Sequence, residues 1–281
     1  MKKLIKIILK VTISSFTRVL IKFRFGRLIA DQIIAALGTA QKDVTHGGVD
    51  LSFVVPNSLN YFRADTFSSK EPETLEWIER IPKGSVFWDI GANVGLYSCY
   101  AAKARSCKVY AFEPSVFNLE ILSRNINLNK LVGNIIIIPL PLTNELKVGT
   151  LNMTSIELGG ALSTFGESYG DDGKNLSPIF EFSTLGISMD EVVRMLKIPL
   201  PSHIKMDVDG IEHLILSGGE FVLRQVSELS IEVNEDFIEQ AANVKKYCQD
   251  AGLVFREKRN SEMLLKSARH GNTFNQVWYR P

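Results

Sequence analysis

Hydrophobic positions recur along this chain with two different periods, and these periods predict its elements. From residue 86 onward, short apolar runs alternate with stretches of helical spacing, which is typical of a parallel sheet with helices on both faces. The predicted strands are Val86–Ile90, Lys108–Phe112, Ile135–Ile138, His203–Val208, Glu228–Val233, Leu253–Glu257 and Phe274–Tyr279. The predicted helices are Leu96–Arg105, Ser115–Asn129, Met189–Lys197, Ile211–Arg224 and Asp236–Asp250.

The end of this pattern favours one arrangement of the sheet. Only a loop, around Asn260–Asn272, connects the last two predicted strands. Such a connection favours an antiparallel final strand over another crossover. We therefore predict an α/β fold with a seven-stranded sheet whose last strand is antiparallel, whereas a Rossmann dehydrogenase would continue with parallel units.

The segments outside this regular pattern carry shorter signals. Val49–Val55 alternates as a strand, Tyr61–Arg63 suggests a second strand, and Glu71–Arg80 suggests a helix that ends before Pro82. Residues 143–188 contain closely spaced glycine, aspartate and Ser-Pro turn signals, which predict an irregular insertion. A long insertion beside a sheet is usually a lid or a substrate wall.

The N-terminal segment has a helical period of its own. Its apolar residues recur every three or four positions, namely Leu9, Ile13, Phe16, Leu20 and Phe23. This spacing predicts an amphipathic helix that ends near Gly26, with a basic opposite face. Residues 1–30 contain eight Lys or Arg and no acid. The longest uncharged run, residues 11–17, is far shorter than the roughly 20 apolar residues of a membrane span, and Lys6 and Lys10 interrupt a would-be signal peptide.

We therefore divide the chain into a basic amphipathic helical extension, residues 1–45, and a domain, residues 46–281. Three roles stay open for the extension. It can contact an anionic membrane surface through residues 1–30, it can pack on the domain, or it can pair two subunits in a homodimer.

Composition narrows the class of protein. The net charge is only +1, and no basic stripe lies outside residues 1–30. The chain also lacks an Asn/Asp-Pro-Pro-Tyr element for a flipped base, so nucleic acid is not an expected partner. Three scattered cysteines are too few for a disulfide framework or a cysteine-based zinc site. We expect a cytoplasmic protein, with any membrane contact peripheral and on the inner face.

A glycine-bearing turn follows the first strand of the regular pattern. Asp89 ends this strand, where it can hold an ammonium group or order the loop. Gly91 and Gly95 allow the backbone to approach a ligand where a Cβ atom would collide. Glu113 ends the next strand, where a carboxylate can accept both hydroxyls of a ribose. Together these residues predict a site for a nucleoside-bearing cofactor.

The spacing of this turn discriminates between two cofactors. A dinucleotide site requires Gly-x-Gly-x-x-Gly and a helix N-terminus that receives a pyrophosphate. Here the spacing is Gly-x-x-x-Gly, and Asn93 occupies the position where a phosphate would need clearance. A nicotinamide-dependent oxidoreductase is therefore the less favoured alternative. S-adenosylmethionine carries no phosphate and fits the looser turn.

Several motifs together resemble the FkbM family of S-adenosylmethionine-dependent methyltransferases. They are Asp-Ile-Gly-Ala-Asn-Val-Gly at 89–95, Phe-Glu-Pro at 112–114, Asn-Ile-Asn-Leu-Asn at 125–129, Met-Asp-Glu-Val at 189–192, Ile-Lys-Met-Asp-Val-Asp-Gly-Ile-Glu at 204–212, Leu-Ser-Gly-Gly at 216–219 and Ser-Ile-Glu-Val at 230–233. The resemblance covers about residues 80–235 and the final strand, but not residues 1–45. It implies a class I methyltransferase (Rossmann-like) fold and O-methylation of a hydroxyl group on a saccharide or another small molecule.

Two positions depart from the family pattern. Asp209 stands where the family more often has Glu, which keeps the charge but shortens the reach. Leu140-Pro141-Leu142-Thr143 replaces an Ala-Leu-Ser type of sequence beside the adenine. A methyltransferase-like module that binds without turnover is the alternative that the sequence leaves open.

The matched motifs assign roles to ten residues. The cofactor-binding residues are Asp89, Gly91, Asn93, Gly95, Glu113 and Pro114. In the 204–212 motif, Asp207 is the candidate base or acceptor-binding acid. Lys205 either balances the charge or pairs with Asp207 or Glu232. Glu212 completes the catalytic set, and Asp209 binds the substrate. Three acids so close together can also hold a divalent metal, but we favour S-adenosylmethionine alone and assign no metal ligand. The alternative without chemistry is an ion-paired network that only shapes the loop.

Overall fold

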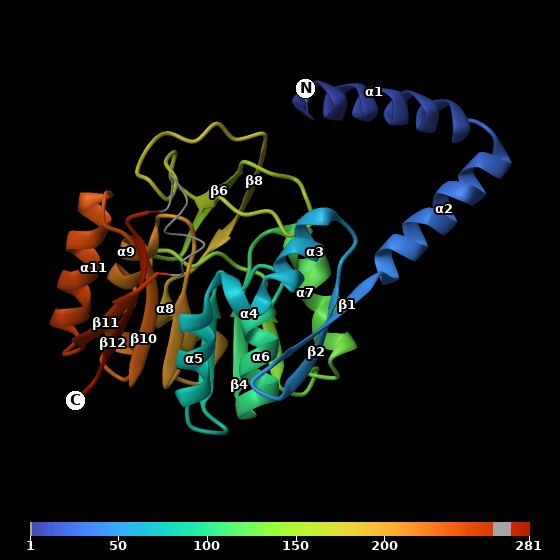
Figure 1. The fold of residues 1–281 in the computed structure, drawn as a ribbon. Helices are drawn as coiled ribbons and strands as arrows, with labels where there is room; N and C mark the ends of the chain where they lie inside the picture. The colour runs from blue at the N-terminus through green and yellow to red at the C-terminus, as the bar shows by residue number, and fades with distance from the viewer. Residues whose placement is uncertain (1, 261–270) are drawn as a thin grey trace.

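The computed structural model describes residues 2–260 and 271–281, and its largest sheet has seven strands. These strands are β3 (Val86–Ile90), β4 (Lys108–Phe112), β5 (Ile135–Ile138), β9 (His203–Met206), β10 (Glu228–Asn234), β11 (Val254–Arg259) and β12 (Thr273–Tyr279). Their order is β11-β12-β10-β9-β3-β4-β5 (Figure 1). Neighbours from β5 to β10 are parallel, whereas β12 runs antiparallel to both β10 and β11. The predicted seven-stranded α/β sheet with its antiparallel last strand is confirmed.

Alternating side chains of the strands point into two hydrophobic cores, one on each face of the sheet. One face is covered by α5 (Pro72–Arg80), α6 (Leu96–Arg105) and α7 (Val116–Leu128), and the other by α8 (Met189–Leu196), α9 (Glu212–Ser217), α10 (Glu220–Leu223) and α11 (Ile238–Asp250). In β3, Phe87 packs into the first core, and Trp88 and Ile90 pack into the second. Burial on both faces explains why these strands read as near-continuous apolar runs.

The single helix expected over Ile211–Arg224 is wrong, because Gly218 and Gly219 divide it into α9 and α10. A Cβ atom on Gly218 would lie 2.6 Å from the carbonyl oxygen of Asn144. A Cβ atom on Gly219 would lie 2.0 Å from the Met189 side chain. The two glycines therefore end α9 at the point where Asn144 and Met189 pack closely against the backbone.

The segment before β3 contains a hairpin and short helices. β1 (Gln41–His46) pairs antiparallel with β2 (Val49–Val54), which confirms the strand expected at Val49–Val55. The strand expected at Tyr61–Arg63 is wrong, because these residues lie inside α3 (Ser58–Asp65), which precedes α4 (Phe67–Lys70). Asn57 caps α3, since its side chain accepts a hydrogen bond from the Asn60 N–H. Such a capping residue selects a helix where a short apolar run is ambiguous.

The insertion over residues 143–188 is more regular than its turn signals predict. It forms a three-stranded antiparallel sheet of β6 (Lys147–Met153), β7 (Ser163–Phe165) and β8 (Phe180–Gly186), in the order β7-β6-β8. This sheet lies beyond one end of the seven-stranded sheet (Figure 1). The loop expected at Asn260–Asn272 falls mostly outside the described residues.

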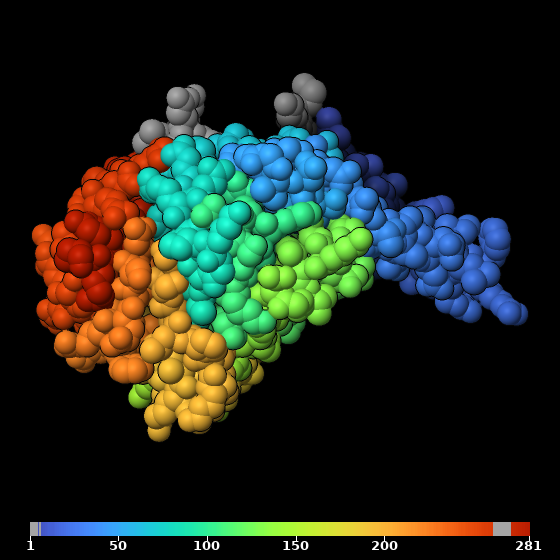
Figure 2. All heavy atoms as spheres, turned by 90° about the horizontal axis from the view of Figure 1, so that it is seen from below, coloured from blue at the N-terminus to red at the C-terminus, as the bar shows by residue number. Residues whose placement is uncertain are grey.

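Two helices at the N-terminus form an arm, which we define as α1 (Lys2–Leu20) and α2 (Arg24–Thr39). The arm projects away from the body of the molecule (Figures 1 and 2). The helix end expected near Gly26 is wrong: the first helix stops at Leu20, and Gly26 lies within α2. A Cβ atom there would meet the carbonyl oxygen of Leu20, so this glycine lets α2 begin close against α1. The expected domain boundary after residue 45 falls inside the β1–β2 hairpin. Among the described helices, none combines the length and apolarity needed to cross a bilayer.

The side chain of Asn125 on α7 ties the β1–β2 hairpin to the turn after β3. Its Oδ1 accepts a hydrogen bond from the Val54 N–H at 2.8 Å, and its Nδ2 donates to the carbonyl of Val94 at 2.8 Å. Asn125 is fully buried, so both backbone groups depend on it for a partner. This residue begins the Asn-Ile-Asn-Leu-Asn motif, and its role is structural.

We expect Asn125→Ala to lower the free energy of unfolding by roughly 2–4 kcal/mol, because it leaves two buried backbone groups without a partner. The matched control is Asn127→Ala on the same helix, where the side chain is exposed. Urea denaturation of both variants measures the difference. Equal midpoints for the two variants would contradict this account of the motif.

Candidate functional site

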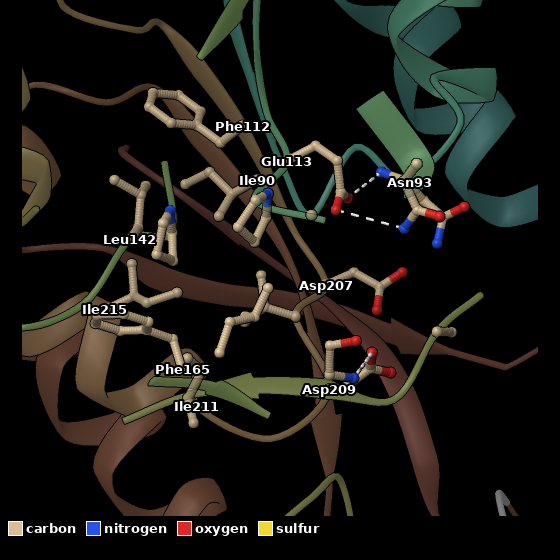
Figure 3. A pocket seen from close by; sticks show the side chains of 18 of the residues that line it. Ile90, Asn93, Phe112, Glu113, Leu142, Phe165, Asp207, Asp209, Ile211 and Ile215 are labelled. Carbon is tan, nitrogen blue, oxygen red and sulfur yellow. Dashed lines mark hydrogen bonds between the residues drawn. The ribbon is translucent and has the colours of Figure 1, made fainter. Parts of the chain in front are cut away.

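Two adjoining cavities lie at the carboxyl ends of β3, β4 and β9. Cavity A extends from Glu113 to Ile215, and Figure 3 shows it from close by. Cavity B extends from Glu232 toward Arg63 on α3. Both cavities are lined by Gly91, Asn93, Ala161, Asp207 and Asp209. The shared lining comes from the turn after β3, the loop after β9 and the insertion.

Cavity A has one apolar end and one polar end (Figure 3). The apolar end is formed by Phe112, Leu140, Pro141, Leu142, Phe165 and Ile215. At the polar end, Glu113 accepts hydrogen bonds from the backbone N–H groups of Asn93 and Ser115, both at 2.8 Å. Pro114 also lines the cavity. The arrangement suits a flat ring joined to a group with hydroxyls.

Burial governs the charge of Glu113. Its side chain is 5% exposed, and desolvation raises the pKa to about 7, although hydrogen bonds from Ser115, Asn93 and Asn118 oppose the shift. The carboxyl group therefore changes its charge near neutral pH. Only the ionised form presents acceptors alone to a ligand's hydroxyl groups.

The two glycines of the turn make room for protein atoms, whereas the sequence suggested that they make room for a ligand. A Cβ atom on Gly91 would lie 1.8 Å from the carbonyl oxygen of Asp207. A Cβ atom on Gly95 would lie 2.4 Å from the side chain of Leu122. Gly91 lines both cavities, whereas Gly95 lines neither and begins α6.

Asp89 lies behind the turn and lines neither cavity. It is 1% exposed, and its Oδ2 accepts a hydrogen bond from the Ser98 hydroxyl at 2.5 Å. In the sheet it stands in register with Lys205. Burial raises the pKa of Asp89, and the Lys205 ammonium opposes that shift. The ammonium group beside Asp89 is therefore that of Lys205, a residue of the protein itself.

Lys205 and Asp207 form a buried ion pair at the edge of cavity B, with Nζ and Oδ2 3.2 Å apart. Burial lowers the pKa of Lys205, but the Asp207 and Asp89 carboxylates outweigh it and leave the pKa raised. Burial likewise raises the pKa of Asp207, but Lys205 and Lys70 outweigh it and leave the pKa lowered. Each group therefore stabilises the charged form of the other.

Cavity B also contains charged residues outside the set of predicted site residues, namely Lys70, Glu71 and Glu232. Glu71 is 2% exposed, and one of its carboxylate oxygens lies 2.6 Å from Nζ of Lys70. Glu232 lines the same cavity, where burial and then the Asp207 and Glu71 carboxylates raise its pKa. The signal for Glu232 was its place in the 230–233 motif. Lys70 and Glu71 gave no signal, because they reach the site through tertiary packing alone.

The insertion is fastened to both cavities by side chains from the main domain. Asn93 and Asn118 both donate to the carbonyl of Gly160, at 2.8 and 3.1 Å. Oδ2 of Asp209 accepts a hydrogen bond from the Leu162 N–H at 2.7 Å. Asp209 has a φ of 62°, a strained value for this residue type, and burial raises its pKa to about 6. The shorter Asp at this position thus holds the insertion against the turn.

Glu212 lies outside both cavities. It is 1% exposed and accepts hydrogen bonds from the Val208 and Gly210 N–H groups, at 2.9 and 3.1 Å. The side-chain amide of Gln240 donates to the same carboxylate. Burial raises the pKa of Glu212 to about 7. Its contacts shape the 208–210 loop, which follows Asp207 and contains Asp209.

Within the described residues, no three His, Cys, Asp or Glu side chains gather in a way that would hold a metal ion. All three cysteines are buried, and burial raises their thiol pKa values. Thiols with raised pKa values are poor nucleophiles.

Comparisons with known proteins show the family of the chain. A family model for the methyltransferase FkbM domain matches residues 89–268. The hexuronic acid methyltransferase AglP of Haloferax volcanii is 28% identical over 168 residues, which are 56% of this chain and 59% of AglP. The methyltransferase sdnD of Sordaria araneosa is 35% identical over 78 residues, which are 27% of this chain and 29% of sdnD. The chain thus spans less than two thirds of either relative.

Solved structures with a similar fold are distant in sequence. M. jannaschii TYW2 in complex with AdoMet aligns with a TM-score of 0.44 and 14% identity, over 86% of this chain and 87% of that one. The precorrin-6y C5,15-methyltransferase of Geobacter metallireducens aligns with a TM-score of 0.45 and 13% identity, over 74% of this chain and 86% of that one.

We expect Gly91→Ala to disrupt the site, because its Cβ atom would displace the Asp207 backbone that lines both cavities. The matched control is Gly84→Ala: Gly84 has a φ of 78°, close to the 83° of Gly91, but open space around it. The control should cost only about 1 kcal/mol of stability, and Gly91→Ala at least about 3 kcal/mol. Urea denaturation measures the loss of free energy of unfolding in each variant, and equal losses would refute the close contact.

Proposed function

The chain belongs to the FkbM family of methyltransferases, and on that basis we propose that it transfers the methyl group of S-adenosylmethionine to a hydroxyl group of a saccharide or similar small molecule. One observation carries this proposal. Glu113 lies at the polar end of cavity A, and Asp207 belongs to the lining that cavities A and B share. A donor in cavity A would therefore present its reactive group to an acceptor in cavity B.

The residues of cavity A fit the methyl donor. The apolar end would receive the adenine, and the Glu113 carboxylate would accept hydrogen bonds from the ribose hydroxyls. The backbone near Gly91 and Asn93 would support the remainder, where the two cavities meet. When bound, the cofactor would supply a methyl group on a sulfonium, whose sulfur would leave as the neutral thioether of S-adenosylhomocysteine. The protein's main contribution is to position the two reactants.

Asp207 is the residue to which we assign the acceptor hydroxyl. Lys205 keeps its carboxylate ionised, so it can accept a hydrogen bond and orient the oxygen toward the methyl group. The hydroxyl proton becomes strongly acidic as the new carbon–oxygen bond forms. Even a carboxylate with a lowered pKa can then take that proton. Asp209 borders both cavities and would contact the acceptor on the side of the insertion.

The lining of cavity B supports a hydroxyl-rich acceptor. It contains carboxylates from Glu71 and Glu232 and cationic groups from Arg63 and Lys70. Such a mixture offers both donors and acceptors to the hydroxyls of a sugar. The relative AglP, named a hexuronic acid methyltransferase, makes uronic acids the first acceptors to test.

We expect the affinity for S-adenosylhomocysteine to fall as the pH drops below 7. The pKa of Glu113 is raised to about 7, and the ligand's hydroxyls require its ionised form, so the affinity should drop by up to about tenfold per pH unit below that pKa. Calorimetric titration measures it. Glu113→Gln should bind roughly 10- to 100-fold more weakly at high pH and lose the pH dependence.

The matched control for this titration is Glu220→Gln, an exposed glutamate on α10. It should bind like the unaltered protein at every pH. An unchanged pH dependence in Glu113→Gln would refute the assignment of the ribose to Glu113. No binding by the folded protein at any pH would refute the proposed cofactor.

We expect Asp207→Asn to lower the rate of methyl transfer about 10²- to 10⁴-fold, because the hydroxyl loses its proton acceptor. The measurement is transfer of labelled methyl groups to a panel of uronic acids and neutral saccharides. The affinity for S-adenosylhomocysteine should change little. Since the single variant leaves Lys205 without its ion-pair partner, the double variant Lys205→Met, Asp207→Asn tests the same loss with the charge balanced.

Two results would count against this assignment. Transfer at an undiminished rate by the single variant would remove Asp207 from the mechanism. Binding of the donor by the unaltered protein, without product on any saccharide or alcohol, would favour a module that binds without turnover.

A further inference from the structure

We propose that the N-terminal arm attaches this protein to an anionic membrane surface. The first observation is the apolar side of α1. Ile5, Ile8, Leu9, Ile13 and Phe16 are each more than half exposed. Their spacing places them on one side of the helix, whereas Lys10 and Arg18 lie on the other side, together with Ile7 and Val11. A helix of this kind can lie in a membrane interface with its apolar side among the acyl chains.

The arm has no partner within the described part of the chain that would cover these side chains. None of its residues belongs to the hydrophobic cores of the body. On α2, Phe25, Leu28 and Ile33 are also more than half exposed, and they line a shallow groove that is almost wholly apolar. An isolated amphipathic helix is only marginally stable in water. The arm therefore requires an apolar surface from outside.

The charge of the arm selects the kind of surface. Eight of the 32 Lys and Arg residues lie within residues 1–30, and all 31 acids lie beyond, so the remainder of the chain carries a net charge of −7. An anionic surface attracts the arm and repels the body, which orients the molecule. Pairing of two arms would bring eight like charges against eight others, so a second copy is a poorer partner than a membrane.

The position of the arm relates the membrane to the cavities. In Figure 1, α1 lies at the same end of the molecule as β6 and β8 of the insertion. In Figure 2, seen from the opposite end, α1 lies largely behind the rest of the molecule. Both cavities are partly lined by the insertion at that end. Attachment through α1 would bring the cavities near the membrane surface.

The test is sedimentation of the full chain with two kinds of vesicle, phosphatidylcholine alone and phosphatidylcholine mixed with phosphatidylglycerol. We expect binding to the mixed vesicles only, weakened by salt. Phe16→Asp, which places a charge among the acyl chains, and the double variant Lys10→Glu, Arg18→Glu should each weaken it about tenfold or more. All variants should keep the affinity for S-adenosylhomocysteine that the unaltered chain shows, or its unfolding midpoint if the chain binds none.

Controls on the body separate the arm from general charge effects. Ile238→Asp is matched to Phe16→Asp, because Ile238 is 73% exposed at the start of α11. Lys245→Glu is matched to the charge reversals on α1, since Lys245 is exposed on α11, the helix that begins at Ile238. Neither should change vesicle binding by as much as the arm variants.

Two outcomes would overturn the proposal. One is equal sedimentation of the unaltered chain with and without mixed vesicles. The other is a stable dimer in analytical ultracentrifugation that Phe16→Asp dissociates, since the apolar side of α1 would then be covered by a second copy. Because neither readout requires methyl transfer, the proposal can fail while the proposed function stands, and the reverse also holds.

Discussion

The contact between Gly91 and the carbonyl oxygen of Asp207 is the constraint on which the site depends. It joins the turn after β3 to the loop after β9, so the two parallel strands deliver their loops into direct contact. A side chain at residue 91 would fill the space that Asp207 occupies. Because both residues line both cavities, this single contact fixes the position of the two cavities relative to each other.

The buried ammonium group of Lys205 offsets the negative charge of the carboxylates around it. Lys205 lies between Asp89, its neighbour in the sheet, and Asp207, its ion-pair partner. Glu232 and Glu71 approach from other elements, and burial together with mutual repulsion raises the pKa of Glu232. Without the lysine, Asp207 would be pushed toward the neutral form, as Glu113 and Asp209 are. The lysine therefore keeps one carboxylate ionised in a setting that favours protonation.

The strands of the central sheet could be predicted because each is a short apolar run bounded by turn residues, a pattern that burial on both faces imposes. The positions of Glu113 and Asp207 followed from the same pattern, since both lie where a strand ends. The helix α3 was mistaken for a strand because a single capping side chain, Asn57, decides its conformation. The sequence indicated that a Cβ atom at residue 91 would collide, but it did not show with which group. The group is the carbonyl of Asp207, which lies 116 residues further along the chain.

The features that the sequence could not show depend on contacts between segments that are distant in the chain. Lys70 enters cavity B from the end of α4 and Glu71 from the residue between α4 and α5, where no local pattern marks them. Glu212 looked catalytic because it shares a motif with Asp207, yet its contacts with Val208, Gly210 and Gln240 are all to the protein. The course of the backbone within a motif determines which of its side chains faces a cavity.

The insertion links the walls of the two cavities. The loop around Gly160 is held by Asn93, whose own N–H is held by Glu113 in cavity A. Two residues further on, Leu162 is held by Asp209 beside cavity B. The Glu113 carboxylate and the Asp209 carboxylate therefore hold one short stretch of the insertion from two sides, and that stretch lines both cavities. A displacement of either carboxylate would move the wall of both cavities at once.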